Sequence, residues 1–360
     1  MLLSEGEIIV KPKSTVRDLE KKFHPPSERK DKIKLDLNEN LMGCSLKVIE
    51  ALKKITCNNV AVYPEYDEFM NKLGSYLSVD VDNILLTNGA DNAIKTVMDT
   101  YLEKGDEIII PVPTFYMFEN YASILGVEKK LVEFNNDLSF PLEKIIGSIT
   151  PDTKMIVIVN PNNPTGTIVN DEDILRVVEA AKDAVVVIDE AYYQFSEKSS
   201  KDMISSYDNV IIIQTFSKGF GLAGVRLGYI ISNKDVINEL KKVVLPYTVN
   251  GLTIVAASAA LDDLDFVNHY VSIVKENRDY ILNELQELGV KTYPSDANFI
   301  IADFGENSNS VLQKLNEKNI LVRDVSNNPL LDGCLRIAIG TREQMETLVD
   351  EIKAINGSEN

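Results

Sequence analysis

The sequence predicts an α/β protein with a mostly parallel, doubly wound sheet in a large domain, followed by a smaller α/β C-terminal domain. Two observations carry this prediction. Between residues 83 and 231, short apolar runs alternate with helical stretches, and after about residue 261 the pattern changes. The runs are rich in β-branched residues and show little period-two alternation, which is typical of strands buried on both faces of a parallel sheet. Strands that alternate with helices favour a doubly wound layout.

The predicted strands of the first domain are residues 83–86, 107–110, 154–159, 184–188, 209–213 and 227–231. The segments between them have helical patterns. One predicted helix covers residues 90–102, behind a Thr-Asn-Gly turn that can begin it. Another covers residues 171–184, with Asn170 or Asp171 as its N-cap.

The second domain begins with a long amphipathic stretch at residues 263–288. Short strands are predicted at residues 298–302, 320–323 and 335–339, with helices between them and a final helix after Thr341. The first forty-odd residues are polar and broken by prolines, so we expect an arm that packs on the small domain. The predicted boundaries are residues 1–45 for the arm, 46–262 for the large domain and 263–360 for the small domain.

Composition narrows the class of protein. Of 360 residues, 44% are hydrophobic and 26% are charged, as in an ordinary soluble globular protein. The net charge of −18 would repel nucleic-acid phosphates and anionic lipid, so neither is an expected partner. No apolar run approaches the roughly 18 residues that a membrane helix needs. The first ten residues have no charged-then-apolar leader pattern, and the expected location is the cytoplasm.

Cysteine and histidine are scarce. The three cysteines (Cys44, Cys57, Cys334) are odd in number and widely spaced, which fits neither a disulfide framework nor a zinc site. Only two histidines are present, His24 and His269, which disfavours a catalytic triad or a metal centre built on histidine. No metal is expected.

The glycines Gly219, Gly221 and Gly224 match the dinucleotide fingerprint GxGxxG, and a predicted strand precedes them. That fingerprint must also open a helix whose N-terminus holds the pyrophosphate. Here the next segment, residues 225–231, has the pattern of a strand. We therefore reject nicotinamide-dinucleotide binding at this loop.

A second set of polar residues follows successive predicted strands. Asn160-Pro-Asn-Asn-Pro-Thr-Gly166 leaves one strand, Asp189-Glu-Ala-Tyr192 the next, and Ser217-Lys218 a third, with Arg226 eight residues further on. Ligands of open α/β sheets bind at the carboxyl ends of strands. An amine, a carboxylate, an amide, a phenol and a guanidinium together suit pyridoxal phosphate, which needs a lysine for a Schiff base and a carboxylate on its pyridinium nitrogen.

Each of these motifs has an ordinary structural explanation when taken alone. Asn-Pro-Thr-Gly is usually a turn, an Asp at a strand end is often a helix cap, and a single Lys is usually solvated surface. Their occurrence together, at successive strand ends and in the order that the parts of the cofactor require, favours the cofactor site.

With these residues in place, the sequence resembles a fold-type-I pyridoxal-phosphate aminotransferase of the aspartate aminotransferase superfamily. It is most similar to the histidinol-phosphate aminotransferase branch, and the resemblance runs from about Lys34 to Ile352. It implies the transferase fold of type I with a seven-stranded sheet. Besides the strand-end motifs and Arg226, its most specific segments are Leu37-Asn-Glu-Asn40, Tyr63-Pro64, Thr87-Asn-Gly-Ala-Asp91, Pro113-Thr-Phe115, Thr215-Phe-Ser-Lys218 and Leu335-Arg336.

The resemblance implies roles for the cofactor-binding residues. Lys218 would form the Schiff base and shuttle the substrate proton, and Asp189 would pair with the pyridinium nitrogen. Asn163 and Tyr192 would bind the phenolic oxygen of the ring, and Phe115 would stack on the ring face. The phosphate would be held by Ser217, Arg226 and the backbone of Ala90 and Asp91 at a helix N-terminus.

The resemblance also implies the substrate contacts and a homodimer. Arg336 would bind a substrate anion as a bidentate fork, and Arg323 would be a second anion clamp. Asn40 and Tyr63 would contact substrate, and Tyr63 would reach the cofactor phosphate of the neighbouring subunit. In a chain of charge −18, an anionic substrate needs such local cations.

Three segments depart from the family pattern. The arm reads Phe23-His-Pro-Pro26 where the family usually has a Pro-Tyr pair, and Leu41-Met-Gly-Cys44 replaces a stretch that often carries prolines. Phe115 stands where the family has Tyr. None of these changes touches the cofactor core, but they lie where substrate is sensed.

The expected function is transamination between glutamate or 2-oxoglutarate and a phosphate-bearing substrate, most simply histidinol phosphate, with ping-pong kinetics. One alternative on the same cofactor is decarboxylation of a phosphorylated amino acid, as in threonine-phosphate decarboxylase. A third hypothesis, a non-catalytic regulatory protein on this fold, predicts a missing Schiff-base lysine or an added DNA-binding segment. Lys218 is present, and the chain has no spare basic domain.

Overall fold

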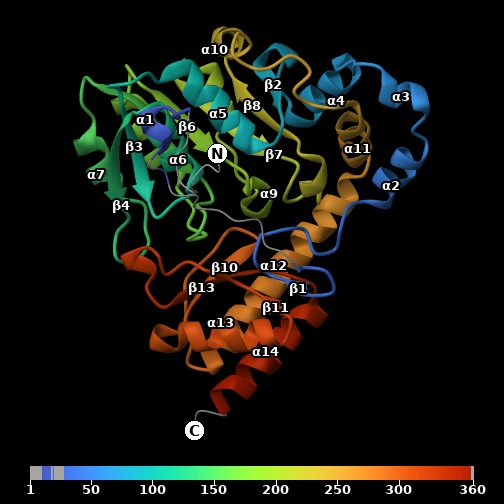
Figure 1. The fold of residues 1–360 in the computed structure, drawn as a ribbon, viewed down its shortest axis with the longest axis vertical. Helices are drawn as coiled ribbons and strands as arrows, with labels where there is room; N and C mark the ends of the chain where they lie inside the picture. The colour runs from blue at the N-terminus through green and yellow to red at the C-terminus, as the bar shows by residue number, and fades with distance from the viewer. Residues whose placement is uncertain (1–9, 18, 20–27, 358–360) are drawn as a thin grey trace, which may run out of the picture.

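The computed structural model of the chain describes residues 10–17, 19 and 28–357. A seven-stranded sheet forms the centre of the upper part in Figure 1, and a four-stranded sheet lies in the lower part. In spatial order the large sheet consists of β2 (Ile84–Thr87), β8 (Gly228–Ser232), β7 (Val210–Thr215), β6 (Val185–Asp189), β5 (Thr153–Val159), β3 (Glu107–Val112) and β4 (Glu128–Glu133). β8 runs antiparallel to both neighbours, and every other pair is parallel.

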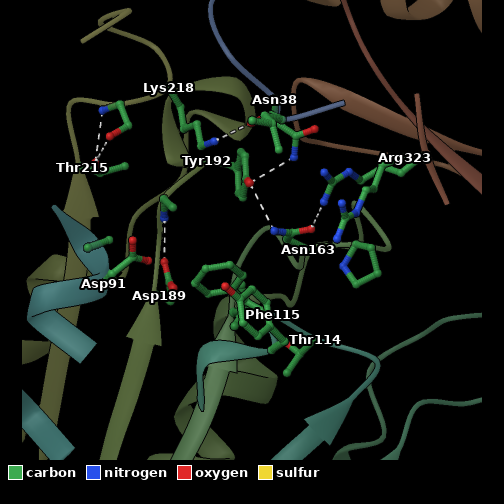
Figure 2. A pocket seen from close by; sticks show the side chains of 18 of the residues that line it. Asn38, Asp91, Thr114, Phe115, Asn163, Asp189, Tyr192, Thr215, Lys218 and Arg323 are labelled. Carbon is green, nitrogen blue, oxygen red and sulfur yellow. Dashed lines mark hydrogen bonds between the residues drawn. The ribbon is translucent and has the colours of Figure 1, made fainter. Parts of the chain in front are cut away.

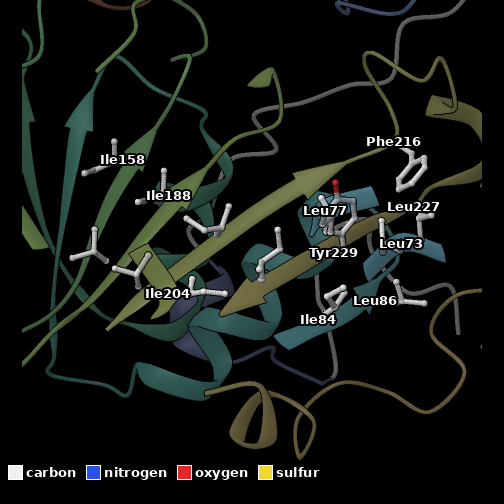
Figure 3. Close-up of a cluster of buried hydrophobic side chains, with 14 of the residues drawn as sticks. Leu73, Leu77, Ile84, Leu86, Ile158, Ile188, Ile204, Phe216, Leu227 and Tyr229 are labelled. Carbon is white, nitrogen blue, oxygen red and sulfur yellow. The ribbon is translucent and has the colours of Figure 1, made fainter. Parts of the chain in front are cut away.

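Helices cover both faces of the large sheet because neighbouring residues of its strands point into opposite cores. Ile158 and Ile188 belong to one core, shown in Figure 3, and Val157 and Val187 belong to the other. Continuous apolar runs are required for this arrangement, which confirms the doubly wound prediction. The helices of this part are α2 (Leu46–Lys53), α3 (Cys57–Ala61), α4 (Asp67–Leu77), α5 (Ala90–Tyr101), α6 (Met117–Leu125), α7 (Leu142–Ser148), α8 (Asp171–Ala180), α9 (Tyr193–Ser196), α10 (Lys234–Leu240) and α11 (Gly251–Leu261).

The small sheet is antiparallel and has its own core. Its strands, in order, are β12 (Arg323–Asp324), β13 (Cys334–Ala338), β10 (Phe299–Asp303) and β9 (Lys291–Thr292). It packs with α12 (Leu264–Glu287), α13 (Ser308–Glu317) and α14 (Arg342–Gly357). α11 ends and α12 begins close to the predicted boundary at residues 262 and 263, although the domain limits themselves stay a prediction.

The predicted strands and helices recur at nearly the same positions, and the two-residue strands β1 and β9 were not predicted. Three further differences have a physical reason. β4 was not predicted because it is an edge strand whose side chains are mostly exposed, so it lacks an apolar run. The strand predicted at 320–323 is split between β11 (Ile320–Leu321) and β12. α8 ends at Ala180 rather than at 184, and the Asn209 amide donates to the carbonyls of Val178, Ala181 and Ala184 at and after the end of this helix.

The expected packing of the N-terminal arm on the small domain is only partly right. Strand β1 (Ile33–Lys34) does pair with β11, in parallel. Helix α1 (Ser14–Arg17), however, lies against α6 of the large part, where Thr15 Oγ1 donates to the Ile124 carbonyl at 2.9 Å. The prediction is wrong for α1 because its polar anchor is the end of α6. Residues 23–26 lie outside the described residues.

The GxGxxG loop leads into strand β8 through one short 3₁₀ turn (Ala223–Val225), not into an α-helix. Gly221 is required for a different reason. Its φ is +70°, and a Cβ there would lie 2.3 Å from the Gly43 carbonyl oxygen. The loop therefore uses glycine for close backbone contact.

Within residues 10–17, 19 and 28–357, no helix is both long enough and apolar enough to cross a lipid bilayer.

Candidate active site

A cavity of about 560 Å³ opens at the carboxyl edge of β5, β6 and β7, facing the small sheet (Figure 2). Large-sheet loops, the segment after β1 and the β12–β13 pair all contribute to its wall. Eleven of the thirteen residues predicted for the site line it: Ala90, Asp91, Phe115, Asn163, Asp189, Tyr192, Ser217, Lys218, Arg226, Arg323 and Arg336. The topology of the large sheet brings nine of these residues together at one edge, and Arg323 and Arg336 come from β12 and β13 of the small sheet.

Lys218 lies in the loop after β7, and its amine points into the cavity (Figure 2). Nζ donates a hydrogen bond to the Leu37 carbonyl at 3.0 Å and lies 5.5 Å from the centre of the Tyr192 ring. Among the described residues, the amine therefore has one carbonyl partner and an aromatic neighbour, and no carboxylate forms an ion pair with it. An amine held in this way can attack an aldehyde.

Asp189 is the last residue of β6 and is only 2% exposed. One carboxylate oxygen accepts a hydrogen bond from the Ala191 N–H at 3.0 Å. Burial raises the pKa of Asp189 to about 7, against an ordinary value of 3.8, and the neighbouring charges of Asp91 and Glu190 add to the rise. A buried carboxyl of this kind fits a cationic ring N–H that shares its proton.

Tyr192, Asn163 and Arg336 form a hydrogen-bonded chain across the cavity. Asn163 Nδ2 donates to the Tyr192 hydroxyl oxygen at 3.3 Å, and Arg336 Nη1 donates to Asn163 Oδ1 at 2.5 Å. Arg336 Nη2 also donates to the Asp36 carbonyl at 2.7 Å. Burial lowers the pKa of Arg336 to about 10, and its Nε has no partner among the described residues. Two hydrogen bonds therefore fix the orientation of this guanidinium, and its Nε–H can donate to an anion.

The opposite end of the cavity suits a phosphate. Helix α5 begins at Ala90, so its first backbone N–H groups point toward the cavity wall. Arg226 Nη2 pairs with Asp91 at 3.1 Å, and Nη1 donates to Ser217 Oγ at 3.4 Å. A helix N-terminus, a guanidinium and a hydroxyl are the donors that a phosphate monoester requires.

Arg323 and Arg336 are register partners on β12 and β13. Both line the cavity, which places two guanidinium groups on adjacent strands at the small-sheet side. This pair is separate from the α5 end, so the cavity has two places for anions.

Gly228 gives the α5 end its shape. A Cβ on this residue would lie 2.5 Å from the Gly89 carbonyl carbon and 2.6 Å from the Ala90 nitrogen, and both are backbone atoms that cannot move aside cheaply. We expect Gly228→Ala to weaken cofactor binding at least tenfold, measured by titration of the apoprotein, and to lower stability by about 1–3 kcal/mol.

The matched control is Gly147→Ala in helix α7, where nothing lies within 4 Å of the added Cβ. That change should leave cofactor affinity unaltered and raise stability by roughly 0.5–1 kcal/mol. Equal cofactor affinity in the two variants would contradict the assignment of this end to the phosphate.

Two predicted residues do not line the cavity. The side chain of Asn40 makes hydrogen bonds within the protein instead. Its Nδ2 donates to the Gly219 carbonyl at 3.3 Å, and its Oδ1 accepts from the Met42 N–H at 3.0 Å. Asn40 therefore does not line the cavity in this arrangement, and its contact with substrate stays a prediction. Tyr63 is 74% exposed and stacks on Tyr247, with ring centres 4.3 Å apart.

Sequence reasoning missed Asn38, Tyr116 and Asp324, which also line the cavity. Asn38 was inside a quoted motif and follows a short strand, so its signal was present. Its φ of +55° is a conformation that asparagine tolerates well. Tyr116 and Asp324 are neighbours of predicted residues and had no pattern of their own.

Comparison with known proteins agrees with this geometry. The family profile described as "Aminotransferase class I and II" matches residues 30–352. A histidinol-phosphate aminotransferase of Ruminiclostridium cellulolyticum is 37% identical over 332 residues, covering 90% of this chain and 92% of that protein.

Solved structures share the fold. The histidinol-phosphate aminotransferase of Sinorhizobium meliloti, in complex with pyridoxal-5'-phosphate, has a TM-score of 0.90 at 21% identity and covers 98% of this chain and 99% of that one. The L-threonine-O-3-phosphate decarboxylase of Porphyromonas gingivalis has a TM-score of 0.79 at 24% identity, with coverage of 90% and 99%. At these identities the likeness establishes the fold alone.

Proposed function

Because this chain belongs to the class I and II aminotransferases and is a pyridoxal-phosphate-dependent enzyme, we propose that it moves an amino group between glutamate and histidinol phosphate. The observation that carries the substrate proposal is the second anion site, formed by Arg323 and Arg336 away from the cofactor phosphate end. The name of the relative at 37% identity supports histidinol phosphate as the phosphorylated substrate.

The described residues fit the cofactor, and each has a proposed task. When bound, pyridoxal phosphate supplies an electron sink for the electrons left on a substrate carbon that loses a proton. Lys218 would attach the cofactor through its amine and, once displaced, hold and move the proton at the substrate Cα. Asp189 would keep the ring nitrogen protonated.

The remaining residues would orient the two ligands. Asn163 and Tyr192 would donate to the phenolic oxygen of the ring, and Phe115 would pack on the ring face. The phosphate would be held by Ser217, Arg226 and the N–H groups of Ala90 and Asp91. Arg336 and Arg323 would bind the anionic ends of the substrates.

The test is the visible absorbance of the cofactor-loaded protein before and after single amines are added: glutamate, histidinol phosphate, phosphoserine and phosphothreonine. We expect glutamate and histidinol phosphate each to convert the visible band to the ultraviolet band of the aminated cofactor. Conversion by phosphothreonine alone, with carbon dioxide released, would assign the site to a decarboxylase instead.

A variant tests, by steady-state kinetics, whether Arg323 contacts the phosphate of the substrate. Arg323→Gln should raise the KM for histidinol phosphate by about 10–100-fold, the value of one charge-assisted contact to phosphate. The KM for glutamate should rise by a smaller factor, because its side-chain carboxylate carries less negative charge at Arg323 than a phosphate does. Arg342→Gln, on an exposed ion pair with Glu346, is the control and should change neither constant.

We also propose that the enzyme is a homodimer in which Tyr63 reaches the cofactor phosphate of the partner. Support comes from exposed apolar side chains around the stacked Tyr63 and Tyr247, on α3, the residues that follow it, the segment before α11 and the first turn of α11. These exposed apolar side chains are Val60, Val62, Leu245 and Leu252.

Sedimentation at micromolar concentration should give twice the chain mass. Tyr63→Phe keeps the ring and should leave the dimer intact while weakening cofactor binding about tenfold, since only the hydroxyl is lost. A monomeric wild-type protein with full activity would contradict the proposal.

A further inference from the structure

Asn38 has no assigned role, yet its side chain reaches into the active site. It lies in the segment Asp36–Asn40, which follows β1 and is called the roof segment below. The residue is 1% exposed, and Nδ2 donates a hydrogen bond to the Tyr192 hydroxyl oxygen at 3.1 Å (Figure 2). The partners are 154 positions apart in sequence, so only the fold brings them together.

The backbone of Asn38 is fixed from several directions. Asn298 Nδ2 donates to the Asn38 carbonyl at 3.1 Å. Arg29 binds the carboxylates on both sides of Asn38: it lies 2.7 Å from Asp36 and 2.5 Å from Glu39. A residue held in this way, with φ of +55°, presents its amide in one orientation.

The hydrogen-bond pattern around Tyr192 is directional. Arg336 Nη1 donates to Asn163 Oδ1, so the other end of that amide, Nδ2, faces Tyr192. The Tyr192 oxygen then accepts from two amide N–H groups, and its own hydrogen is left for a third partner. Asn38 Oδ1 is buried and has no partner among the described residues.

We propose that Asn38 is a positioning residue that acts through Tyr192. By donating to the phenol oxygen, it polarises the O–H bond and directs the hydrogen toward the ring oxygen of the cofactor, since hydrogen bonds in a chain strengthen one another. The inference rests on the proposed contact of Tyr192 with that ring oxygen.

The consequence is spectroscopic. A stronger hydrogen bond to the ring oxygen stabilises its negative charge and makes the protonated link between cofactor and lysine easier to deprotonate. We therefore expect Asn38 to lower the pH at which half of this link is deprotonated, which is the midpoint of the pH-dependent change in the visible absorbance band. The charged groups that line the same cavity, all unchanged in the variants below, are Glu39, Asp91, Asp189, Lys218, Arg226, Arg323, Asp324 and Arg336.

The experiment measures that midpoint in the cofactor-loaded protein. Asn38→Gly removes the amide but accepts the positive φ, and it should raise the midpoint by about 0.4–1 pH unit, the value of one neutral hydrogen bond. Asn38→Asp can only accept a hydrogen bond, so it should draw the phenol hydrogen away and raise the midpoint further. Tyr192→Phe should also raise it.

The double variant decides whether Asn38 acts through Tyr192. In the Tyr192→Phe background, Asn38→Gly should cause no further shift. The control is Asn319→Gly, an exposed asparagine with φ of +61°, which should leave the midpoint unchanged. The dissociation constant of the cofactor should stay within threefold of wild type in Asn38→Gly.

An unchanged midpoint in Asn38→Gly overturns the inference. An equal shift with and without the Tyr192 hydroxyl overturns it as well, because Asn38 would then act by another route. The single variant Tyr192→Phe reports separately on the proposed Tyr192 contact, so the two failures are distinguishable.

Discussion

Replacement of Lys218 by alanine is expected to lower kcat by at least about 10³-fold while the fold is retained. The change removes the covalent attachment of the cofactor and the group that moves the substrate proton, and general acid–base catalysis alone contributes about 10²–10⁴-fold. In the structure no other lysine lines the cavity within the described residues. A second amine is therefore not placed to substitute.

The measurement is single-turnover kinetics together with the visible spectrum. Lys218→Ala should still bind the cofactor through the phosphate end at α5, but without the band of the lysine adduct. Lys353→Ala, on a surface ion pair with Glu284, is the matched control and should keep both turnover and band. Retention of more than a tenth of wild-type turnover by Lys218→Ala would exclude the proposed role.

The residues proposed to bind the cofactor could be predicted because the order and direction of the strands determine which residues meet. β5, β6 and β7 are adjacent and parallel, so residues that follow each strand must meet at one edge. Their apolar runs identified the strands, and the polar residues after them identified the chemistry. Lys218, Asp189 and Asn163 therefore follow from local sequence plus one general rule of sheet connectivity.

The roof segment could not be predicted in the same way. The contact between Asn38 and Tyr192 and the contact between Arg336 and the Asp36 carbonyl join the start of the chain to distant strands. No periodicity encodes such pairs, because each depends on how the small sheet lies against the large one. Asn40 illustrates the point: the motif was recognised, but the fold turns its neighbour Asn38 toward the cavity.

Strand β4, at the edge of the large sheet, was not predicted for a different reason. Only Val132 of its six residues is buried, so the apolar signal that identifies central strands is absent. The large sheet therefore has one more strand than the six apolar runs indicated, and the additional strand is the edge strand next to β3.

Asp189 connects stability to function through its pKa. In the folded apoprotein this pKa is about 7, against 3.8 for an exposed aspartate. The folded state therefore binds the proton more tightly, and the free energy of unfolding falls as pH rises from about 4 to about 7. Above that range the loss is complete and amounts to roughly 4 kcal/mol. A cationic ring nitrogen at this position would offset the penalty.

Asp189→Asn should consequently separate the two properties. Asparagine does not ionise, so the unfolding free energy of the variant apoprotein, relative to wild type, should increase between pH 5 and pH 8 by about 2–3 kcal/mol. A pH-independent offset from the new amide does not alter this slope. Turnover of the loaded variant should fall by at least about 10²-fold, because a neutral amide does not hold the ring nitrogen protonated.

Denaturant unfolding of both apoproteins at pH 5 and pH 8 measures the slope. Asp350→Asn, which makes the same change at an exposed residue of α14, is the matched control. Parallel pH profiles for Asp189→Asn and wild type would show that Asp189 is already ionised near pH 5 in the folded apoprotein. The carboxylate would then need no cationic partner, and the strongest physical argument that this cavity is built for a pyridinium ring would be lost.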